Sequence, residues 1–486
     1  MSDSPTRAWT DFIDRVSFDD LPSDVVRQTK LYILDTIGCA LGGYAIESGK
    51  NVIEAGLELG GPGQATVLGS GDKLHVSNAA YVNGKLSNLL DADEIFYSTK
   101  HIGGIPLFPS LSLGEHSHAS GKEVIAAVAL AYDFAARVGF CGSIFKNDPE
   151  KGFMASGGGT MAFGTFSAAV SAAKMLKLER NQIVDALTLA AHFAPGAMES
   201  KFAFAHSSTK YGDMGWFCHS GVIAGLLARH GYPGDPTILD GPAGLHKMTG
   251  ALDFDYDSFT ADLGDQWYIL DAGFKPYPTC RWFHTGIKLL EDIMRERRLT
   301  PGDIDKITVA TTPMVVGLPS YAAANNWADV DNKDASLSQF SITYALACTA
   351  YGIAPGPDWA MPQTLNDPAI GNFTKRITQV AHPEAMQAWS AYEGHPGKMH
   401  CHAPTSIELV TKQGTFNAES WDLPGDSWNP ATRMSEEDIA IKFAINVRSV
   451  LSSKEVERLI ETVQRMEMLD DIGELMALTA KLRVRT

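Results

Sequence analysis

The order of secondary-structure patterns along the chain limits its fold more than any other feature of the sequence. Up to about residue 265, apolar residues recur with helical spacing, for example over 23–41 and 122–138. Short strand-like runs follow at 267–270, 305–313 and 406–416, and helical spacing returns after residue 430. This order predicts a mainly α fold in which helical material brackets an α+β insertion, although three consecutive domains would give the same order.

Small residues dominate several of the predicted helices. An alanine-rich pattern covers 122–138, and a second helix with a glycine-rich start covers 157–178. Small side chains permit close helix–helix contact, whereas a dinucleotide fingerprint requires a β-strand before its glycines. The sequence predicts no such strand, so close packing is the favoured role. Further helices are predicted at 79–90, 181–191, 215–229, 284–297 and 334–350, after a cap at Ser435, and through most of 453–482.

Composition excludes several classes of function. The 486 residues suggest two or three domains, or one large domain with an insertion. The net charge of −17 argues against a nucleic-acid partner, which would require basic patches. The N-terminus lacks an apolar signal core, and the longest apolar run, 124–132, is too short to span a membrane. Six cysteines without a CxxC pair fit free thiols in a reducing compartment, so we expect a cytoplasmic protein.

The segment from Leu86 to Glu115 has the closest grouping of ionisable residues within apolar sequence. Asp91, Asp93 and Glu94 occur together in an apolar frame, and His101 follows them. Charges are costly to bury unless they are paired, and neighbouring carboxylates cannot all ionise cheaply. One carboxyl should therefore have a shifted pKa, as a general acid or base requires. The alternative is an exposed acidic helix end followed by a loop.

Two other motifs predict little chemistry. His400 and His402 flank a cysteine, and a strand would place both histidines on one face. A structural zinc site needs about four ligands, and no second ligand pair accompanies them, so we expect no metal. The GxSxG motif of serine hydrolases is also absent from the sequence.

Longer segments resemble a known family. LDADEIFYSTKHIGG, FGTFSAAVSAAKMLKL, HSSTKYGDMGWFCHSGVIAGLLA, FKPYPTCRWFH and the closing helix pair resemble the MmgE/PrpD family, in order, from about residue 8 to 483. That family includes 2-methylcitrate dehydratase, cis-aconitate decarboxylase and iminodisuccinate epimerase. The resemblance implies a helical domain of residues 1–266 and 432–486, and a smaller α+β lid domain of 267–431. It also implies an active site between them, no metal or organic cofactor, and a homodimer.

The resemblance also implies site residues. Asp91 matches the catalytic acid, and His101 matches the histidine of a His-Pro-Ser segment that reads His-Ile-Gly here. Lys210 and Lys275 match two lysines of the family's site, and these four residues form the expected catalytic set. The substrate-binding residues expected beside them are Asp93, Tyr211, Arg281, His284 and Tyr321. Arg281 suits a bidentate grip on a carboxylate.

Two positions depart from the family pattern. Met154 stands where members that dehydrate or decarboxylate commonly have a histidine, and Ile95 replaces a polar residue. We expect a lyase that needs no cofactor, resembles 2-methylcitrate dehydratase and removes a proton α to a carboxylate of a small carboxylic acid. A decarboxylase, an isomerase or epimerase using the same proton abstraction, and a catalytically silent metabolite-binding protein remain alternatives. A thioether cannot transfer protons, so Met154 favours return of the proton to carbon.

Overall fold

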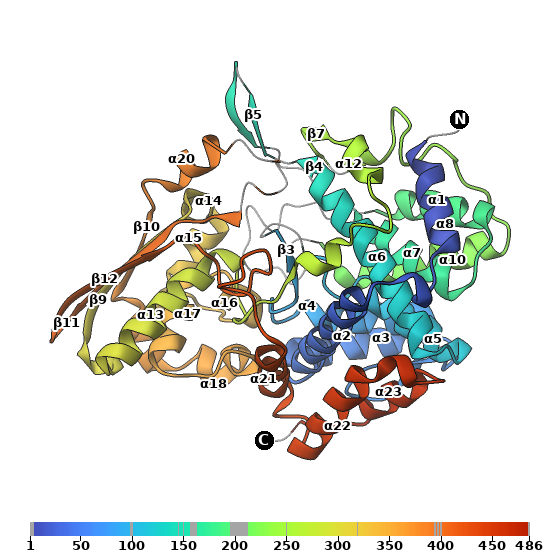
Figure 1. The fold of residues 1–486 in the computed structure, drawn as a ribbon. Helices are drawn as coiled ribbons and strands as arrows, with labels where there is room; N and C mark the ends of the chain where they lie inside the picture. Colours follow the sequence, from blue (N-terminus) through green and yellow to red (C-terminus); the bar gives the residue numbers. More distant parts are fainter. Residues whose placement is uncertain are drawn as a thin grey trace.

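The computed structural model describes residues 4–97, 101–143, 145–148, 150–155, 163–194, 212–248, 250–317, 319–392, 395, 398 and 401–484. Helices dominate it, as the sequence predicts, and a single larger β-sheet lies at one side (Figure 1). The N-terminal half contains the helices α1 (Pro5–Arg15), α2 (Ser23–Tyr44), α3 (Glu47–Leu59), α4 (Val76–Asn88), α5 (Leu107–Ser117), α6 (Gly121–Cys141), α7 (Phe163–Met175), α8 (Arg180–Phe193), α10 (Met214–Arg229), α11 (Leu245–Met248) and α12 (Tyr256–Thr260).

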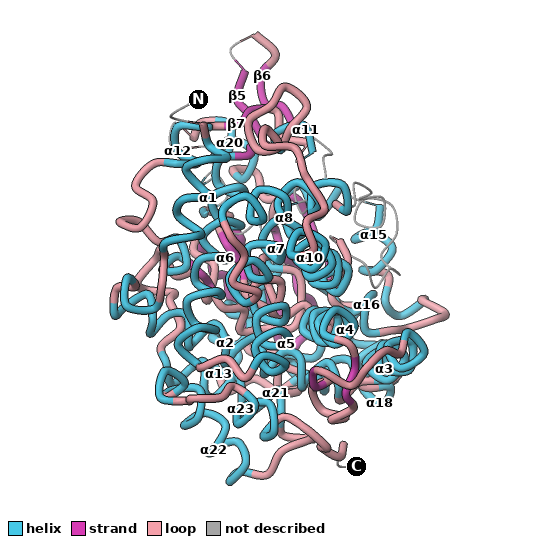
Figure 2. The backbone as a smooth tube through the Cα atoms, turned by 90° about the vertical axis from the view of Figure 1, so that its right-hand side faces the viewer, coloured by secondary structure: helices cyan, strands magenta, loops and turns pink. Residues whose placement is uncertain are grey.

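These helices pack closely around α6 and α7. The contacting pairs include α4 with α10, α7 with α10, α6 with α7, and α2 with α4 (Figure 2). A Cβ on Gly43 would lie 2.1 Å from the Leu86 carbonyl oxygen, and one on Gly221 would lie 2.3 Å from the Ala168 Cβ. The contact of Gly221 with Ala168 confirms the predicted close packing for the helix within 157–178, and the contact of Gly43 with Leu86 shows the same device between α2 and α4.

Helix α6 is long and apolar enough to cross a membrane by length and composition. All of its apolar window is buried inside the protein, and Ser120 and Glu123 form a capping box at its start. It is therefore the central core helix of this half.

The larger sheet has the strand order β10-β9-β11-β12 and consists of β9 (Ile304–Thr311), β10 (Ile377–Ala381), β11 (Thr405–Thr411) and β12 (Gly414–Ser420). β10 is parallel to β9, with Ile377 opposite Ile307, whereas β11 is antiparallel to β9 and β12. Its accompanying helices are α13 (His284–Arg297), α14 (Pro313–Gly317), α15 (Pro319–Asn325), α16 (Ala335–Ser338), α17 (Ile342–Ala350), α18 (Pro362–Leu365), α19 (Pro368–Thr374) and α20 (Ala385–Ser390).

Two predictions for this part are wrong. The run 267–270 is not a strand: Tyr268–Asp271 forms the 3-10 helix η2, anchored because the Tyr268 N–H donates to Asp133. The predicted helix 334–350 is broken between α16 and α17. At the break, the Gln339 carbonyl accepts hydrogen bonds from the Thr279 hydroxyl and the Cys280 N–H instead of from a later turn of the same helix.

Short strands occur outside the larger sheet, in antiparallel pairs. They are β1 (Ala65–Thr66) with β2 (Lys73–Leu74), β3 (Ile95–Phe96) with β8 (Ala272–Gly273), β4 (Gly142–Ser143) with β7 (Asp253–Phe254), and β5 (Phe145–Asp148) with β6 (Gly152–Ala155). The remaining 3-10 helices are η1 (Phe18–Asp20), η3 (Arg281–Phe283), η4 (Pro301–Asp303), η5 (Trp327–Asp329), η6 (Pro357–Ala360) and η8 (Met466–Met468).

The β5–β6 hairpin corrects one argument from the sequence. β6 directly precedes the glycine-rich segment, where no strand was expected. The hairpin projects from the body of the protein in both views (Figures 1 and 2), and among the described strands β6 pairs with β5 alone. A dinucleotide-binding unit would instead need a strand within a parallel sheet. The glycines at 157–159 lie outside the described residues.

The C-terminal helices pack against helices of the N-terminal half. α21 (Glu436–Val447) begins after the predicted cap Ser435 and packs against α2, followed by α22 (Ser453–Gln464) and α23 (Gly473–Leu478). The β3–β8 pair joins Ile95 to Gly273 and so links the acidic segment to the chain that leads into α13. The boundaries at 266/267 and 431/432 remain a proposal.

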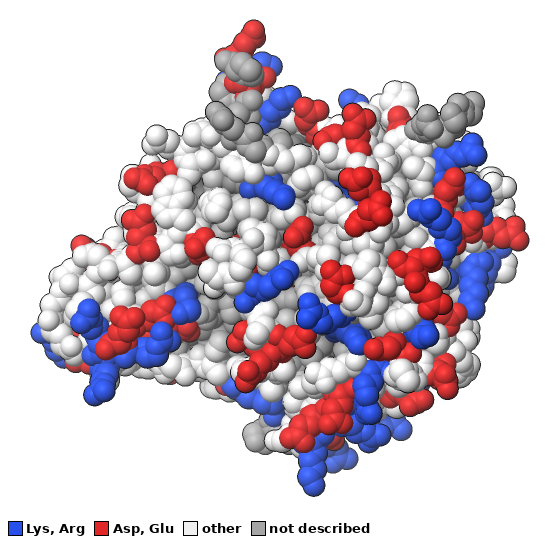
Figure 3. Space-filling model, viewed as in Figure 1, with Lys and Arg blue, Asp and Glu red and all other residues white. Residues whose placement is uncertain are grey.

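Charges of both signs are interspersed over the surface drawn in Figure 3. Over the described residues on that face, lysines and arginines alternate with aspartates and glutamates and form no continuous basic area.

Candidate active site

The acidic segment forms a buried turn directly after α4. Asp91 has the left-handed backbone conformation, with φ of 52°, and its N–H donates to the Asn88 carbonyl. Asp91, Asp93 and Glu94 are all fully buried. The exposed acidic helix end, which the sequence left as the alternative, is therefore wrong.

Lys275 neutralises the first carboxylate of this turn. Its Nζ lies 3.0 Å from Asp91 Oδ2 and 2.5 Å from the Asp91 carbonyl oxygen, and both side chains are fully buried. Burying a charge without a partner is costly, so each of these groups requires the other. The structure thus brings together two residues of the expected catalytic set.

Three side chains from later in the chain donate to the carbonyls of the turn. Gln339 Nε2 donates to Leu89 O at 2.6 Å, Lys275 to Asp91 O, and Lys442 Nζ to Ala92 O at 2.6 Å. The last carbonyls of a helix lack partners within the helix and attract cations. These donors therefore fix the turn at the point where α4 ends.

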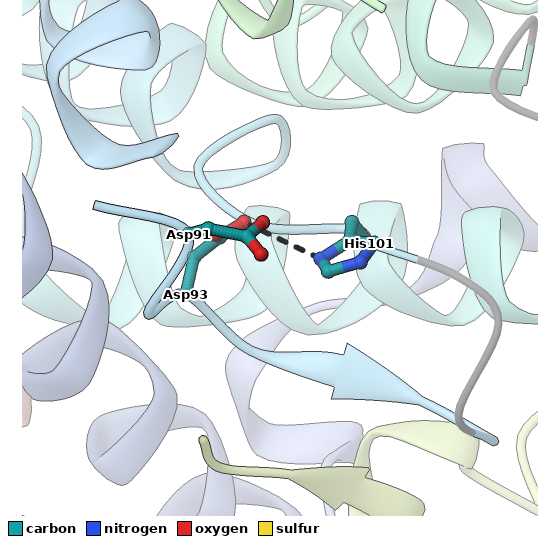
Figure 4. Close-up of side chains that lie close together, drawn as sticks. All are labelled: Asp91, Asp93 and His101. Atoms are coloured by element: carbon teal, nitrogen blue, oxygen red, sulfur yellow. Dashed lines mark ion pairs between the residues drawn. The ribbon is translucent and has the colours of Figure 1, made fainter. Parts of the chain in front are cut away.

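His101 lies beside the second carboxylate of the turn. Its Nδ1 is 4.0 Å from Asp93 Oδ2, while Asn88 Nδ2 donates to Asp93 Oδ1 at 2.9 Å (Figure 4). The side chain of His101 points toward Asp91 and Asp93 in Figure 4. An imidazole next to a carboxylate is suited to accept and return a proton.

The side chains of Asp91, Asp93 and His101 are spaced closely enough to bind a metal ion. Their ligand atoms lie within 4.8 Å of one another. The Lys275 ammonium already supplies a positive charge to Asp91, and a second cation beside it would be repelled. We therefore assign no metal to this group.

The histidine-flanked cysteine does not form the strand on which its metal argument depended. Cys401 and His402 precede β11, which begins at Thr405, and His402 is exposed. His400 lies outside the described residues.

Glu94 holds the backbone after His101. Its Oε2 accepts from the Ile102 N–H at 3.1 Å and the Gly103 N–H at 2.9 Å, and Tyr132 contacts its Oε1. Burial raises the pKa of Glu94 to about 8. The sequence predicted one shifted carboxyl in this cluster, but burial is its main cause and the neighbouring charge of Asp93 contributes less.

Arg281 and His284 lie on the segment that supplies Lys275 to the turn. Arg281 Nη2 pairs with Asp426 in the interior, and burial lowers the pKa of Arg281 to about 9. Burial, followed by the charges of Arg281 and Lys275, lowers the pKa of His284, so its imidazole is neutral at pH 7. His284 Nε2 lies 3.1 Å from the Thr279 carbonyl oxygen.

Within the part of the chain that the structure describes, Arg281 Nη1, His284 Nδ1 and Gln339 Oε1 are buried polar atoms near the turn that have no hydrogen-bond partner. Buried polar atoms are normally paired, so such atoms call for an explanation. A bound polar molecule is one explanation, because a carboxylic acid carries acceptors for a guanidinium and, through hydroxyl groups, donors for an amide oxygen.

Tyr321 lies next to Cys280, the residue before Arg281. It is buried, and its hydroxyl lies 3.4 Å from Cys280 Sγ. Burial raises the pKa of Tyr321, and the proximity of Cys280 and Asp91 adds to the effect, so the phenol is protonated.

Two expected site residues, Lys210 and Tyr211, lie outside the described residues. Ile95 is buried in β3, opposite Gly273. Met154 is half-buried in β6 opposite Lys146, on the projecting hairpin. The structure therefore brings together the expected Asp91, Asp93, His101, Lys275, Arg281, His284 and Tyr321.

The sequence did not predict four residues that contact the turn or pair with residues near it, namely Gln339, Asp426, Asp35 and Lys442. Asp35 and Lys442 each occupy a charged position inside an apolar helix, which is the signal that singled out the acidic segment. Gln339 and Asp426 carry no such local signal.

Known proteins match the chain over nearly its whole length. The MmgE/PrpD N-terminal domain matches residues 7–256, and the MmgE/PrpD C-terminal domain matches residues 277–468. A cis-aconitate decarboxylase of Aspergillus terreus is 23% identical over 482 residues, covering 95% of this chain and 92% of the relative. Cis-aconitate decarboxylases of Mus musculus and Homo sapiens are each 24% identical, covering 98% of this chain and 93% and 95% of the relatives. Since both family domains match in order, the chain belongs to the MmgE/PrpD family.

Proposed function

We propose that the protein is a lyase that moves a proton at a carbon next to a carboxylate of a small carboxylic acid. The observation that carries this proposal is the fully buried pair of Asp91 and Lys275, with His101 beside the same turn. A buried ion pair next to an imidazole can remove a proton and hold the negative charge that develops on the substrate.

Each group has a proposed role. Asp91 or His101 acts as the base, and Lys275 stabilises the enolate-like charge. Arg281 grips a substrate carboxylate through the Nη1 that has no protein partner. Neutral His284 and protonated Tyr321 supply hydrogen bonds without adding charge.

Among lyase reactions we propose decarboxylation first, because the relatives above are named cis-aconitate decarboxylases. In that step the bond to the departing carboxylate breaks, and its electron pair remains on the substrate as an enolate-type anion. An acid of the site then protonates this anion and CO2 leaves. Dehydration, as in 2-methylcitrate dehydratase, would instead begin with removal of the α-proton by the base, and it needs a second acid to protonate the leaving hydroxyl.

An isomerase or epimerase is the second candidate, and Met154 favours it. If no side chain protonates a leaving group, the abstracted proton returns to carbon. The experiment that separates these reactions is proton NMR in deuterated water with citrate, 2-methylcitrate, cis-aconitate, itaconate and iminodisuccinate. Loss of CO2 identifies a decarboxylase, loss of water a dehydratase, and deuterium in an unchanged skeleton an isomerase.

The Asp91→Asn variant provides the decisive comparison. It should abolish exchange of the substrate's α-proton and the uptake of deuterium at that carbon, because the amide can neither carry a proton nor balance the Lys275 ammonium. Unimpaired exchange in this variant would reject the proposed mechanism. Silence of the wild type across the panel, without a thermal shift from any of these acids, would reject the proposed substrate class.

A further inference from the structure

A second buried lysine touches the acidic turn from the C-terminal end of the chain. Lys442 lies on α21, and its Nζ is 2.6 Å from Asp35 Oδ1 on α2 and 2.6 Å from the Ala92 carbonyl oxygen. Lys442 and Asp35 are both buried. Ala92 stands between Asp91 and Asp93, so this contact reaches the backbone that carries both carboxylates.

Stability alone does not account for this ion pair. A buried pair loses the hydration of both charges and is often no more stabilising than apolar side chains of similar volume. The other buried residues of α21 are the apolar Ile439, Phe443 and Val447 and the polar Asn446, and none of them carries a charge. A charge in this position therefore points to a role in the adjacent site.

The charged and titratable groups around Lys442 link it to that site. Asp35, Cys39 and Asp93 raise the pKa of Lys442 against the opposing effect of burial, so the ammonium is charged. Lys442 also contributes to the lowered pKa of His284. Asp93 in turn is faced by His101, Glu94 and Tyr32.

We propose that Lys442 is a positioning residue of the active site, which fixes the Asp91–Asp93 turn through the Ala92 carbonyl and favours the ionised form of its carboxylates. Lys275 and Lys442 donate to consecutive carbonyls, those of Asp91 and Ala92. Because Asp91 has a left-handed conformation that non-glycine residues adopt rarely, the turn needs such restraints. The inference rests on the proposed function, in which these carboxylates take part in proton transfer.

Variants of the two partners should act in opposite directions. Lys442→Met removes a positive charge beside the turn, so the acidic limb of the kcat/KM profile should move to higher pH by about 0.5 to 1 unit. Asp35→Asn removes the negative charge next to Lys442, while the Asp93 charge and the Ala92 carbonyl still favour the ammonium, so the same limb should move to lower pH. A purely structural pair would lower stability in both variants and move the limb in neither.

A second readout does not depend on turnover. Histidine NMR signals of His101, assigned by comparison with His101→Asn, report the field at Asp93 because His101 Nδ1 lies 4.0 Å from its Oδ2. Lys442→Met should raise the pH at which His101 titrates, and Asp35→Asn should lower it. If the wild type is inactive on the whole panel, the proposed function fails, while these titrations still decide the role of Lys442.

The chain offers a matched control. Lys30 on α2 donates to the Gln464 carbonyl at 2.7 Å and pairs with Glu467 at 2.8 Å, so it also ties α2 to the C-terminal segment, but away from the turn. Lys30→Met should leave the activity profile and the His101 titration unchanged. Equal titration curves in wild type, Lys442→Met and Asp35→Asn would overturn the proposal. If Lys442→Met does not fold, Asp35→Asn and the conservative Lys442→Arg, which should keep the wild-type profile, decide it.

Discussion

Lys275 Nζ lies 3.0 Å from Asp91 Oδ2, although 184 residues separate them along the chain. Both side chains are fully buried, so the pair joins the end of α4 to the segment that leads into α13 without contact with water. Two charges in such a setting interact strongly, and removal of either leaves the other without compensation. The pair therefore supports both the fold and the proposed chemistry, and variants can separate these roles.

Lys275→Met should abolish detectable turnover, because it removes the positive charge that stabilises the developing enolate, an effect of at least about 100-fold. It should also lower the free energy of unfolding by about 3–5 kcal/mol, since Asp91 is left as an unpaired buried charge. The double variant Lys275→Met/Asp91→Asn should regain much of this stability in urea denaturation and remain inactive. Recovery of activity in the double variant would contradict the proposed roles.

Gly103 occupies the position where the related family has a serine. Its φ is 49°, and a Cβ there would lie 2.7 Å from Asp93 Oδ2. Gly103→Ala should therefore cost about 1–2 kcal/mol for the left-handed conformation and displace the carboxylate, lowering kcat/KM at least about tenfold. The control is Gly352→Ala, because Gly352 has φ of 68° with no atom within 4 Å of the added Cβ. It should lose similar stability and keep full activity, and equal activity in both variants would reject the role of Gly103.

Asp426→Asn tests the ion pair that compensates the buried charge of Arg281. Both side chains of this pair are nearly inaccessible to water, so the neutral amide leaves the guanidinium uncompensated. The free energy of unfolding should fall by about 3–5 kcal/mol, and KM for the acid should rise as Arg281 loses its orientation. Asp358→Asn removes the partner of Arg448 from a surface ion pair and should cost about 1 kcal/mol or less. Urea denaturation of both variants gives the comparison, and equal losses would contradict it.

The sequence predicted the helices that have regular apolar spacing, and the acidic segment with its apolar frame. It also predicted α13 at the residues that the structure shows, because the periodicity of 284–297 is uninterrupted. It failed at 267–270, where an apolar run is held as a 3-10 helix by contact with α6, a long-range effect. Local propensity does not contain that information.

The site shows the same limit. The acidic cluster singled out Asp91 from local sequence, whereas Lys275 was found only through the family resemblance, since no local pattern links positions so far apart. Gln339 was missed because its function follows from a hydrogen bond to Leu89, 250 residues away. Lys442 could have been noticed, because a lysine within IAIKFAI is a charge in apolar surroundings. Its contact with Ala92 becomes apparent only when α21 packs against α2.

Glu94 should make the stability of the protein depend on pH. Its pKa is about 8 in the folded chain, against 4.5 for the ordinary group, because it is buried. Between these values the native state keeps a proton that the unfolded chain releases. The stabilisation is therefore complete below pH 4.5 and is lost as the pH rises through 8, by at most about 1.4 kcal/mol per unit.

Glu94→Gln is the variant that isolates this effect. A glutamine has nearly the shape of the protonated carboxyl and can accept from the N–H groups of Ile102 and Gly103, but it cannot titrate. The difference in free energy of unfolding between wild type and Glu94→Gln, measured in urea from pH 5 to 8.5, should decrease steadily as the pH rises. Glu457→Gln, at an exposed position on α22, is the matched control for the loss of one carboxylate. A flat difference for Glu94→Gln would show that Glu94 is already ionised at pH 5, and that its contacts with the loop after His101 are those of a carboxylate.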